Sequence, residues 1–281
     1  MKPKFFSFAA AACFLAALLL SVPLSAEPLD KFTGQKGTIN IAGGTAHIPV
    51  MTGAARRIMD KNSDINITVT GGGSGVGVQQ VGEGLVQIGN TGRPLKEGEI
   101  EKYGLVSFPF AIDGVAVVVN PKNQVGELTK AQLIDVFAGR VTNWKELGGS
   151  DAGINLYVRE DGSGTREVFE DRALDKGTSV ASANVVNSNG AMKTAVTQDE
   201  NGIGYVGIGH LDDKLKGIVL DGMTPSQTGA ADGSYKVTRL LYMNTKGQPE
   251  GLLRDFIDYI YTDDGAEIIR GAGYIPTGPA K

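Results

Sequence analysis

Apolar residues along the chain recur with two different periods, and segments of the two kinds alternate from about residue 38 to residue 270. Short runs rich in Val, Ile and Thr are typical of β-strands, whose side chains alternate between two faces or are buried on both. Longer segments with apolar residues three and four positions apart predict amphipathic helices. This alternation predicts an α/β fold in which helices flank mixed sheets.

The predicted elements follow one another without an internal repeat or a low-complexity linker. We expect strands at residues 38–42, 65–70, 86–89, 115–119, 154–158, 185–186, 203–206, 218–220 and 237–243. We expect helices at residues 46–61, 76–81, 129–137, 165–174, 249–261 and 266–270. The run VAVVV at 115–119 is apolar throughout, which predicts a strand buried on both faces. Two lobes joined by extended crossovers are expected rather than two domains on a flexible tether.

Three glycine-rich turns share one layout, in which a strand leads into a tight loop with a hydroxyl residue and then into a helix. They are GGTA at 43–46, GGSG at 72–75 and DGSGT at 161–165. A helix N-terminus presents unpaired N–H groups and a partial positive charge, and glycine lets a ligand approach the backbone closely. Such residues also serve in turns and caps without any ligand. Three such loops in one chain nevertheless favour an oxyanion site.

Charged residues near these loops suggest how an anion is recognised. Arg159 ends the predicted strand 154–158, so its planar guanidinium can reach the same cleft as the loop 161–165 and make strong paired hydrogen bonds to an oxyanion. Asp161 either contacts the ligand or orients Arg159. Asp113 precedes Gly114, and its carboxylate would suit an anion that carries a proton, such as hydrogen phosphate, while repelling sulfate.

Composition and the remaining motifs exclude several classes of protein. The net charge is −4, whereas a nucleic-acid-binding surface needs a basic balance. The two histidines, His47 and His210, are expected on a first helical turn and on a surface turn, and neither belongs to a catalytic motif. No metal site, cofactor or enzymatic activity is expected. Glycine, with 40 of 281 residues, is more frequent than in an average protein.

Residues 1–26 are typical of a signal peptide. Lys2 and Lys4 precede an apolar stretch at 5–20, and small residues up to Ala26 offer a cleavage site. The apolar stretch is short for a membrane crossing, which needs about 20 residues. A lipid on Cys13 is the alternative to cleavage after Ala26. Cleavage would remove the single cysteine and both lysines, so the mature protein would carry a net charge of −6.

Several motifs together resemble the phosphate-binding proteins of bacterial ABC transporters, the PstS-like group of type 2 periplasmic binding proteins. The resemblance runs from about residue 37 to residue 276 and is most specific at 71–75, 128–149, 159–165, 201–205 and 273–276. It implies a two-lobed periplasmic receptor that closes on one inorganic phosphate and delivers it to ABC permease subunits, with no span of the membrane once the signal is cleaved.

The resemblance also implies a set of binding residues. Together with the reasoning above, the predicted phosphate contacts are Thr45, Ala46, Ser74, Gly75, Asp113, Arg159, Asp161, Ser163, Gly164 and Thr165. Some members of the group have a proton-accepting aspartate where this chain has Gly92, so Asp113 is expected to accept the ligand proton instead. Arg93 is expected either to form a salt bridge or to contact the ligand.

The sequence thus predicts one lobe at residues 27–114 with 245–281 and a second at 115–244, with the ligand between them. Three alternatives stay open: a receptor for another tetrahedral oxyanion, a secreted phosphatase on the same scaffold, and an extracellular module that holds phosphate structurally. The phosphatase lacks an evident metal site or general base in the sequence.

Overall fold

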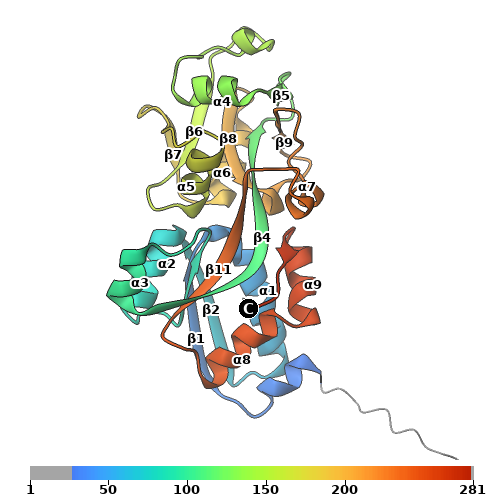
Figure 1. Ribbon diagram of the computed structural model, residues 1–281. Helices are drawn as coiled ribbons and strands as arrows, with labels where there is room; N and C mark the ends of the chain where they lie inside the picture. The colour runs from blue at the N-terminus through green and yellow to red at the C-terminus, as the bar shows by residue number, and fades with distance from the viewer. Residues whose placement is uncertain (1–26, 280–281) are drawn as a thin grey trace, which may run out of the picture.

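The computed structural model describes residues 27–279, and the predicted signal peptide at 1–26 lies outside the described residues. The described chain forms two lobes, each built around its own hydrophobic cluster, and two long strands run from one lobe into the other (Figure 1). Within residues 27–279, no helix is both long and apolar enough to cross a membrane.

The first lobe contains both ends of the described chain. Its elements are η1 (Pro28–Phe32), β1 (Gly37–Gly43), η2 (Thr45–His47), α1 (Ile48–Lys61), β2 (Ile65–Gly72), α2 (Gly73–Gly82), β3 (Ile88–Thr91), α3 (Glu97–Tyr103), α8 (Gly251–Ile260), α9 (Asp263–Gly271) and β12 (Ile275–Pro276). Strand β1 is parallel to its neighbours β2 and β3. On α8, Phe256, Ile257 and Ile260 lie on one face and are buried in the core, as the helical period requires.

The second lobe is formed by the middle of the chain. Its elements are β5 (Glu127–Leu128), α4 (Lys130–Phe137), η3 (Trp144–Leu147), β6 (Asn155–Arg159), α5 (Gly164–Arg172), β7 (Asn184–Val186), α6 (Asn189–Gln198), β8 (Gly202–Gly207), η4 (Ile208–His210), β9 (Lys216–Gly217), β10 (Val219–Leu220) and α7 (Gln227–Asp232). Strand β6 is parallel to β7 and β8. Phe169 stacks on Tyr205 at 3.9 Å between ring centroids, which fixes α5 against β8.

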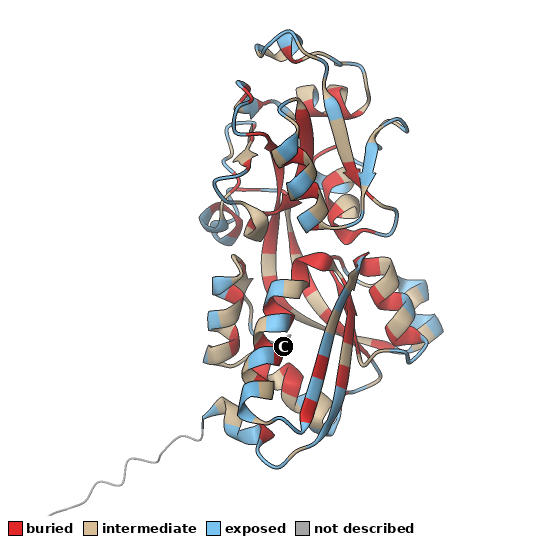
Figure 2. Cartoon of the chain, turned by 180° about the vertical axis from the view of Figure 1, so that it is seen from behind, coloured by how far each residue is buried: buried red, intermediate tan, exposed pale blue. Residues whose placement is uncertain are grey.

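Strands β4 (Leu105–Val119) and β11 (Thr238–Lys246) connect the lobes. Strand β11 pairs antiparallel with β4 up to Gly114, which lies opposite Thr238. From Val115 onward β4 pairs with β8 instead. The strand order is therefore β2-β1-β3-β11-β4-β8-β6-β7, and the partner of β4 changes between Gly114 and Val115. Seen from behind, the strands between the lobes are largely buried (Figure 2).

The α/β fold class expected from the sequence is confirmed, and so is the burial of 115–119, where no side chain is more than 1% exposed. The strand expected at 86–89 is shifted, since β3 begins at Ile88. The helix expected from residue 46 opens as the 3-10 turn η2 and becomes α-helical at Ile48. Helices α3, α6 and α7 were not predicted because they are short and bury few apolar side chains.

Both histidines are more enclosed than the sequence suggests. His47 is fully buried, and its ring packs edge-on against Phe110 at 5.6 Å. Burial, with a further contribution from the Arg239 charge, lowers the pKa of His47 from 6.5 to about 3. His210 does not lie on a surface turn: it is half-buried in η4, and burial lowers its pKa to about 4. Both imidazoles are therefore neutral in the folded protein.

These buried histidines predict loss of stability in mild acid. Below about pH 6.5 the unfolded chain binds protons on both rings, whereas the folded chain does not until the pH approaches 4 and then 3. The free energy of unfolding should be highest above pH 6.5 and fall by up to about 1.4 kcal/mol per pH unit for each histidine. Urea titrations at pH 7, 6 and 5 measure this slope.

The matched variant is His47→Gln, which keeps a polar side chain but cannot titrate. It should be less stable than the parent at pH 7, yet its stability should decline less steeply between pH 6 and 5. An unchanged slope would contradict the assignment.

Candidate functional site

A small cavity lies where the two lobes meet, with an empty volume of about 190 Å³. The first lobe contributes the loop after β1, the start of α2 and the loop after β3, and the second contributes the end of β6 and the start of α5. The lining residues are Gly44, Thr45, Ala46, His47, Gly73, Ser74, Gly92, Arg159, Ser163, Gly164, Thr165 and Arg239. The cavity therefore unites the three glycine-rich turns that the sequence singled out.

Two α-helices begin at this cavity. Helix α5 starts at Gly164, and the side chain of Ser163 caps it by accepting a hydrogen bond from the Arg166 N–H. Helix α2 starts at Gly73. The first N–H groups of a helix have no intrahelical partner and carry the positive end of its dipole. Both helices thus favour negative charge in the cavity.

Four buried hydroxyl groups line the cavity, and each already accepts a hydrogen bond from a protein N–H. Ser74 Oγ accepts from the Gly92 N–H (3.0 Å), and Ser163 Oγ accepts from the Arg166 N–H (3.3 Å). Thr165 Oγ1 accepts from Arg239 Nη1 (2.8 Å). Thr45 Oγ1 accepts from both the N–H and the Nδ2 of Asn189 (3.3 and 3.1 Å). A hydroxyl that accepts such a bond keeps its own proton free. All four can therefore donate to a ligand.

Arg159 brings a buried positive charge to the cavity. Its side chain is 1% exposed, and its Nε and Nη2 donate to the two carboxylate oxygens of Glu160 at 2.8 Å each. Its remaining nitrogen, Nη1, is buried and has no hydrogen-bond partner among residues 27–279. A buried donor without a partner is costly, so an acceptor from a ligand is the partner that completes this site.

Arg239 is a lining residue that sequence reasoning missed. Its Nε and Nη2 donate to Asp113 Oδ2 at 3.0 and 2.7 Å, and its Nη1 donates to Thr165 Oγ1 in the first turn of α5. Asp113 also accepts from the Ile208 N–H, and although burial raises the pKa of Asp113, the Arg239 charge opposes that rise. In the sequence, Arg239 could have been recognised as the one charged residue in the mostly apolar run 237–243.

Three of the predicted contact residues lie outside the cavity lining. Asp113 faces Arg239 rather than the cavity, so it positions that guanidinium. The Asp161 side chain is 98% exposed and pairs with Arg166 at 2.8 Å rather than with Arg159. The Gly75 N–H donates to the carbonyl oxygen of Gly162 at 3.0 Å. This N–H, which was predicted to bind the ligand, thus already has a partner within the protein.

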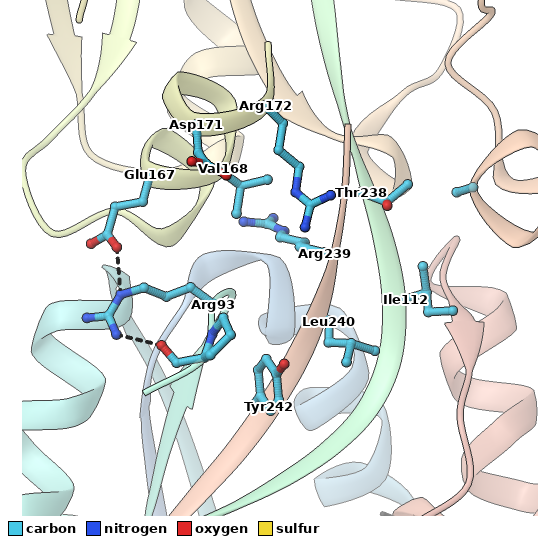
Figure 3. A pocket seen from close by; sticks show the side chains of 12 residues that line it. Arg93, Ile112, Glu167, Val168, Asp171, Arg172, Thr238, Arg239, Leu240 and Tyr242 are labelled. Carbon is cyan, nitrogen blue, oxygen red and sulfur yellow. Dashed lines mark hydrogen bonds and ion pairs between the residues drawn. The ribbon is translucent and has the colours of Figure 1, made fainter. Parts of the chain in front are cut away.

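Arg93 forms salt bridges, as one of its two expected roles required. It pairs with Glu99 at 2.8 Å in its own lobe and with Glu167 at 2.9 Å in the other. It lines a second, more open hollow between α5 and β11, with its guanidinium pointing to Glu167 (Figure 3). Arg93 thus ties the lobes together beside the cavity.

Within residues 27–279, no group of three or more His, Cys, Asp or Glu side chains is placed to hold a metal ion. The site is instead a cluster of hydrogen-bond donors around a small buried space, and that chemistry suits an oxyanion.

Comparisons with known proteins agree with this geometry. Residues 32–264 match the family model described as the PBP superfamily domain. A protein of Bacillus subtilis named phosphate-binding protein PstS is 38% identical over 248 residues, which cover 87% of this chain and 82% of the relative.

Solved structures agree in the same way. A structure from Clostridium perfringens, described as a phosphate ABC transporter substrate-binding protein with bound phosphate, superposes with a TM-score of 0.81 at 32% identity, over 86% of this chain and 100% of the other. An ABC-type phosphate transport receptor of Vibrio cholerae gives a TM-score of 0.69 at 32% identity, over 84% and 99%. These are binding proteins rather than enzymes. The chain belongs to the PBP superfamily and, within it, to the PstS family.

Proposed function

We propose that this protein is a receptor that captures inorganic phosphate between its lobes, outside the cytoplasm, and delivers it to the permease of an ABC transporter. The observation that carries the proposal is Arg159 Nη1, a buried donor without a partner among residues 27–279, in a cavity lined by four hydroxyl groups that can all donate. The names of the B. subtilis and V. cholerae relatives supply the transport role.

The proposed contacts are those predicted residues that line the cavity, with Arg239 added. They are Thr45, Ala46, Ser74, Arg159, Ser163, Gly164, Thr165 and Arg239. Residues from both lobes belong to this set, so the anion would hold the lobes together. For the lobes we propose the boundaries 27–114 with 245–281, and 115–244.

For localisation we propose the periplasm, reached by cleavage of the signal peptide after Ala26. The mature protein should then begin at Glu27, and intact-mass spectrometry of the exported protein measures this directly. A mass that includes a lipid on Cys13 would contradict the proposal and indicate membrane anchoring instead.

Replacing Arg159 tests the phosphate site. Calorimetry on protein stripped of phosphate should give one site per chain. Arg159→Met should weaken phosphate binding at least about 100-fold, because it removes a buried charged donor and leaves Glu160 without its partner. The matched control is Arg172→Met at the end of α5: Arg172 is exposed and lies outside the cavity lining, so its loss should leave affinity unchanged. Equal affinities for the two variants would refute the role of Arg159.

Gly164→Ala tests whether the lobes must close tightly on the ligand. A Cβ at position 164 would lie 2.3 Å from Ser74 Oγ in the other lobe, so the lobes would be held apart. We expect phosphate affinity to fall about tenfold or more, and small-angle scattering should show a larger radius with phosphate than the parent shows. Gly98→Ala is the control, since Gly98 is also helical and its Cβ would meet nothing within 4 Å.

A further inference from the structure

We propose that Arg93 and Glu167 form an ionic latch between the lobes, which sets how long the closed form holds phosphate without touching the anion itself. The inference rests on the proposed function, because the rate of release has a meaning only if the cavity binds phosphate. It assigns a positioning role to two residues that lie outside the cavity lining.

Few ion pairs join the two lobes. Among residues 27–279, the salt bridges between the proposed lobes are Asp113–Arg239, Arg93–Glu167 and Lys96–Glu167. Asp113 and Arg239 lie opposite each other on the connecting strands β4 and β11, so they remain neighbours when one lobe rotates against the other. The pairs of Glu167 instead join α5 to the segment that follows β3, and these two elements are not paired within the sheet. Separation of the lobes on this side must therefore break the pairs of Glu167.

Arg93 is held in position by its own lobe. Its Nη1 and Nη2 donate to the two carboxylate oxygens of Glu99 at 2.8 Å each, and Nη1 also donates to the Pro94 carbonyl oxygen at 2.9 Å. The remaining nitrogen, Nε, has no hydrogen-bond partner in that lobe among residues 27–279, and it lies 2.9 Å from Glu167 Oε2 (Figure 3). A planar guanidinium that is already fixed loses little conformational entropy when Glu167 reaches it, so the pair retains most of its attraction.

Glu167 connects the latch to the cavity. It lies in the first turn of α5, shortly after Ser163, Gly164 and Thr165, which line the cavity. A salt bridge on Glu167 therefore holds the start of α5 against the first lobe. Neither Glu167 nor Arg93 lines the cavity, so removal of their pair should weaken the closed form and leave the contacts of the ligand in place.

The burial of this pair distinguishes it from a surface ion pair. The Arg93 side chain is 8% exposed and that of Glu167 is 33% exposed, whereas ion pairs between fully exposed side chains contribute little. Water and salt therefore screen the attraction between Arg93 and Glu167 less than they screen a surface pair. An anion that contacts both lobes leaves when they separate, so loss of the pair should act on release rather than on capture.

The experiment measures the release of radiolabelled phosphate from the mature protein after it is mixed with an excess of unlabelled phosphate. Glu167→Gln should release phosphate at least about five times faster than the parent, while the association rate constant, obtained from the release rate and the calorimetric affinity, should change less than about twofold. Asp171→Asn is the matched control: Asp171 is exposed, lies one turn further along α5, carries the same charge and is not paired with Arg93 (Figure 3). Equal release from the two variants, or a loss of affinity that comes from slower association, overturns the latch while leaving phosphate capture intact. A parent protein that binds no phosphate would instead refute the proposed function.

A double-mutant cycle tests whether the two residues act through each other. Arg93→Gln alone should also speed release, but it removes the Glu99 contacts as well, so this variant by itself does not isolate the latch. In the Arg93→Gln background, adding Glu167→Gln should change the release rate less than about twofold, compared with about fivefold or more in the parent. Glu167→Asp needs no change at Arg93: it keeps the charge on a shorter side chain and should release phosphate at a rate between those of the parent and Glu167→Gln. An undiminished effect of Glu167→Gln in the Arg93→Gln background would mean that Glu167 acts by another route and would overturn the inference.

Discussion

The structure depends on keeping two guanidinium groups buried at the boundary between the lobes. A buried charge without partners is strongly unfavourable, so each arginine is bound on one side by a carboxylate: Arg159 by Glu160 and Arg239 by Asp113. The acids fix the orientation of the guanidinium groups and leave their other donors directed at the cavity or at its hydroxyls. Stability and recognition therefore rely on the same ion pairs, and the remaining donors have their best acceptor in an anion.

Much of the site could be predicted because its chemistry is local in sequence. A glycine-rich turn, a hydroxyl residue and a helix start lie within five positions of one another, and this signal correctly identified Thr45, Ser74 and Ser163 as members of one cavity. Arg239 and Asp113 could not be found in this way. They are far apart in sequence and meet only because β11 and β4 pair in one particular register, which the residue pattern does not determine.

The fold shows the same division between local and long-range information. The apolar run at 115–119 predicted a buried strand correctly, because continuous burial leaves a clear mark in composition. That β4 extends back to Leu105 and serves both lobes was not visible, since most side chains in its first half are only partly buried. Helix α6 was missed because it has only two larger apolar side chains to bury, those of Met192 and Val196.

The change of partner along β4 has a mechanical consequence. Any rotation of one lobe against the other must bend β4 near Gly114, where its pairing passes from β11 to β8, and must also bend the start of β11. Asp113 and Arg239 lie opposite each other at this point. The joint and the proposed anion contact Arg239 thus belong to the same few peptide units, so an ion bound to Arg239 would stiffen the joint itself, and its release would loosen it.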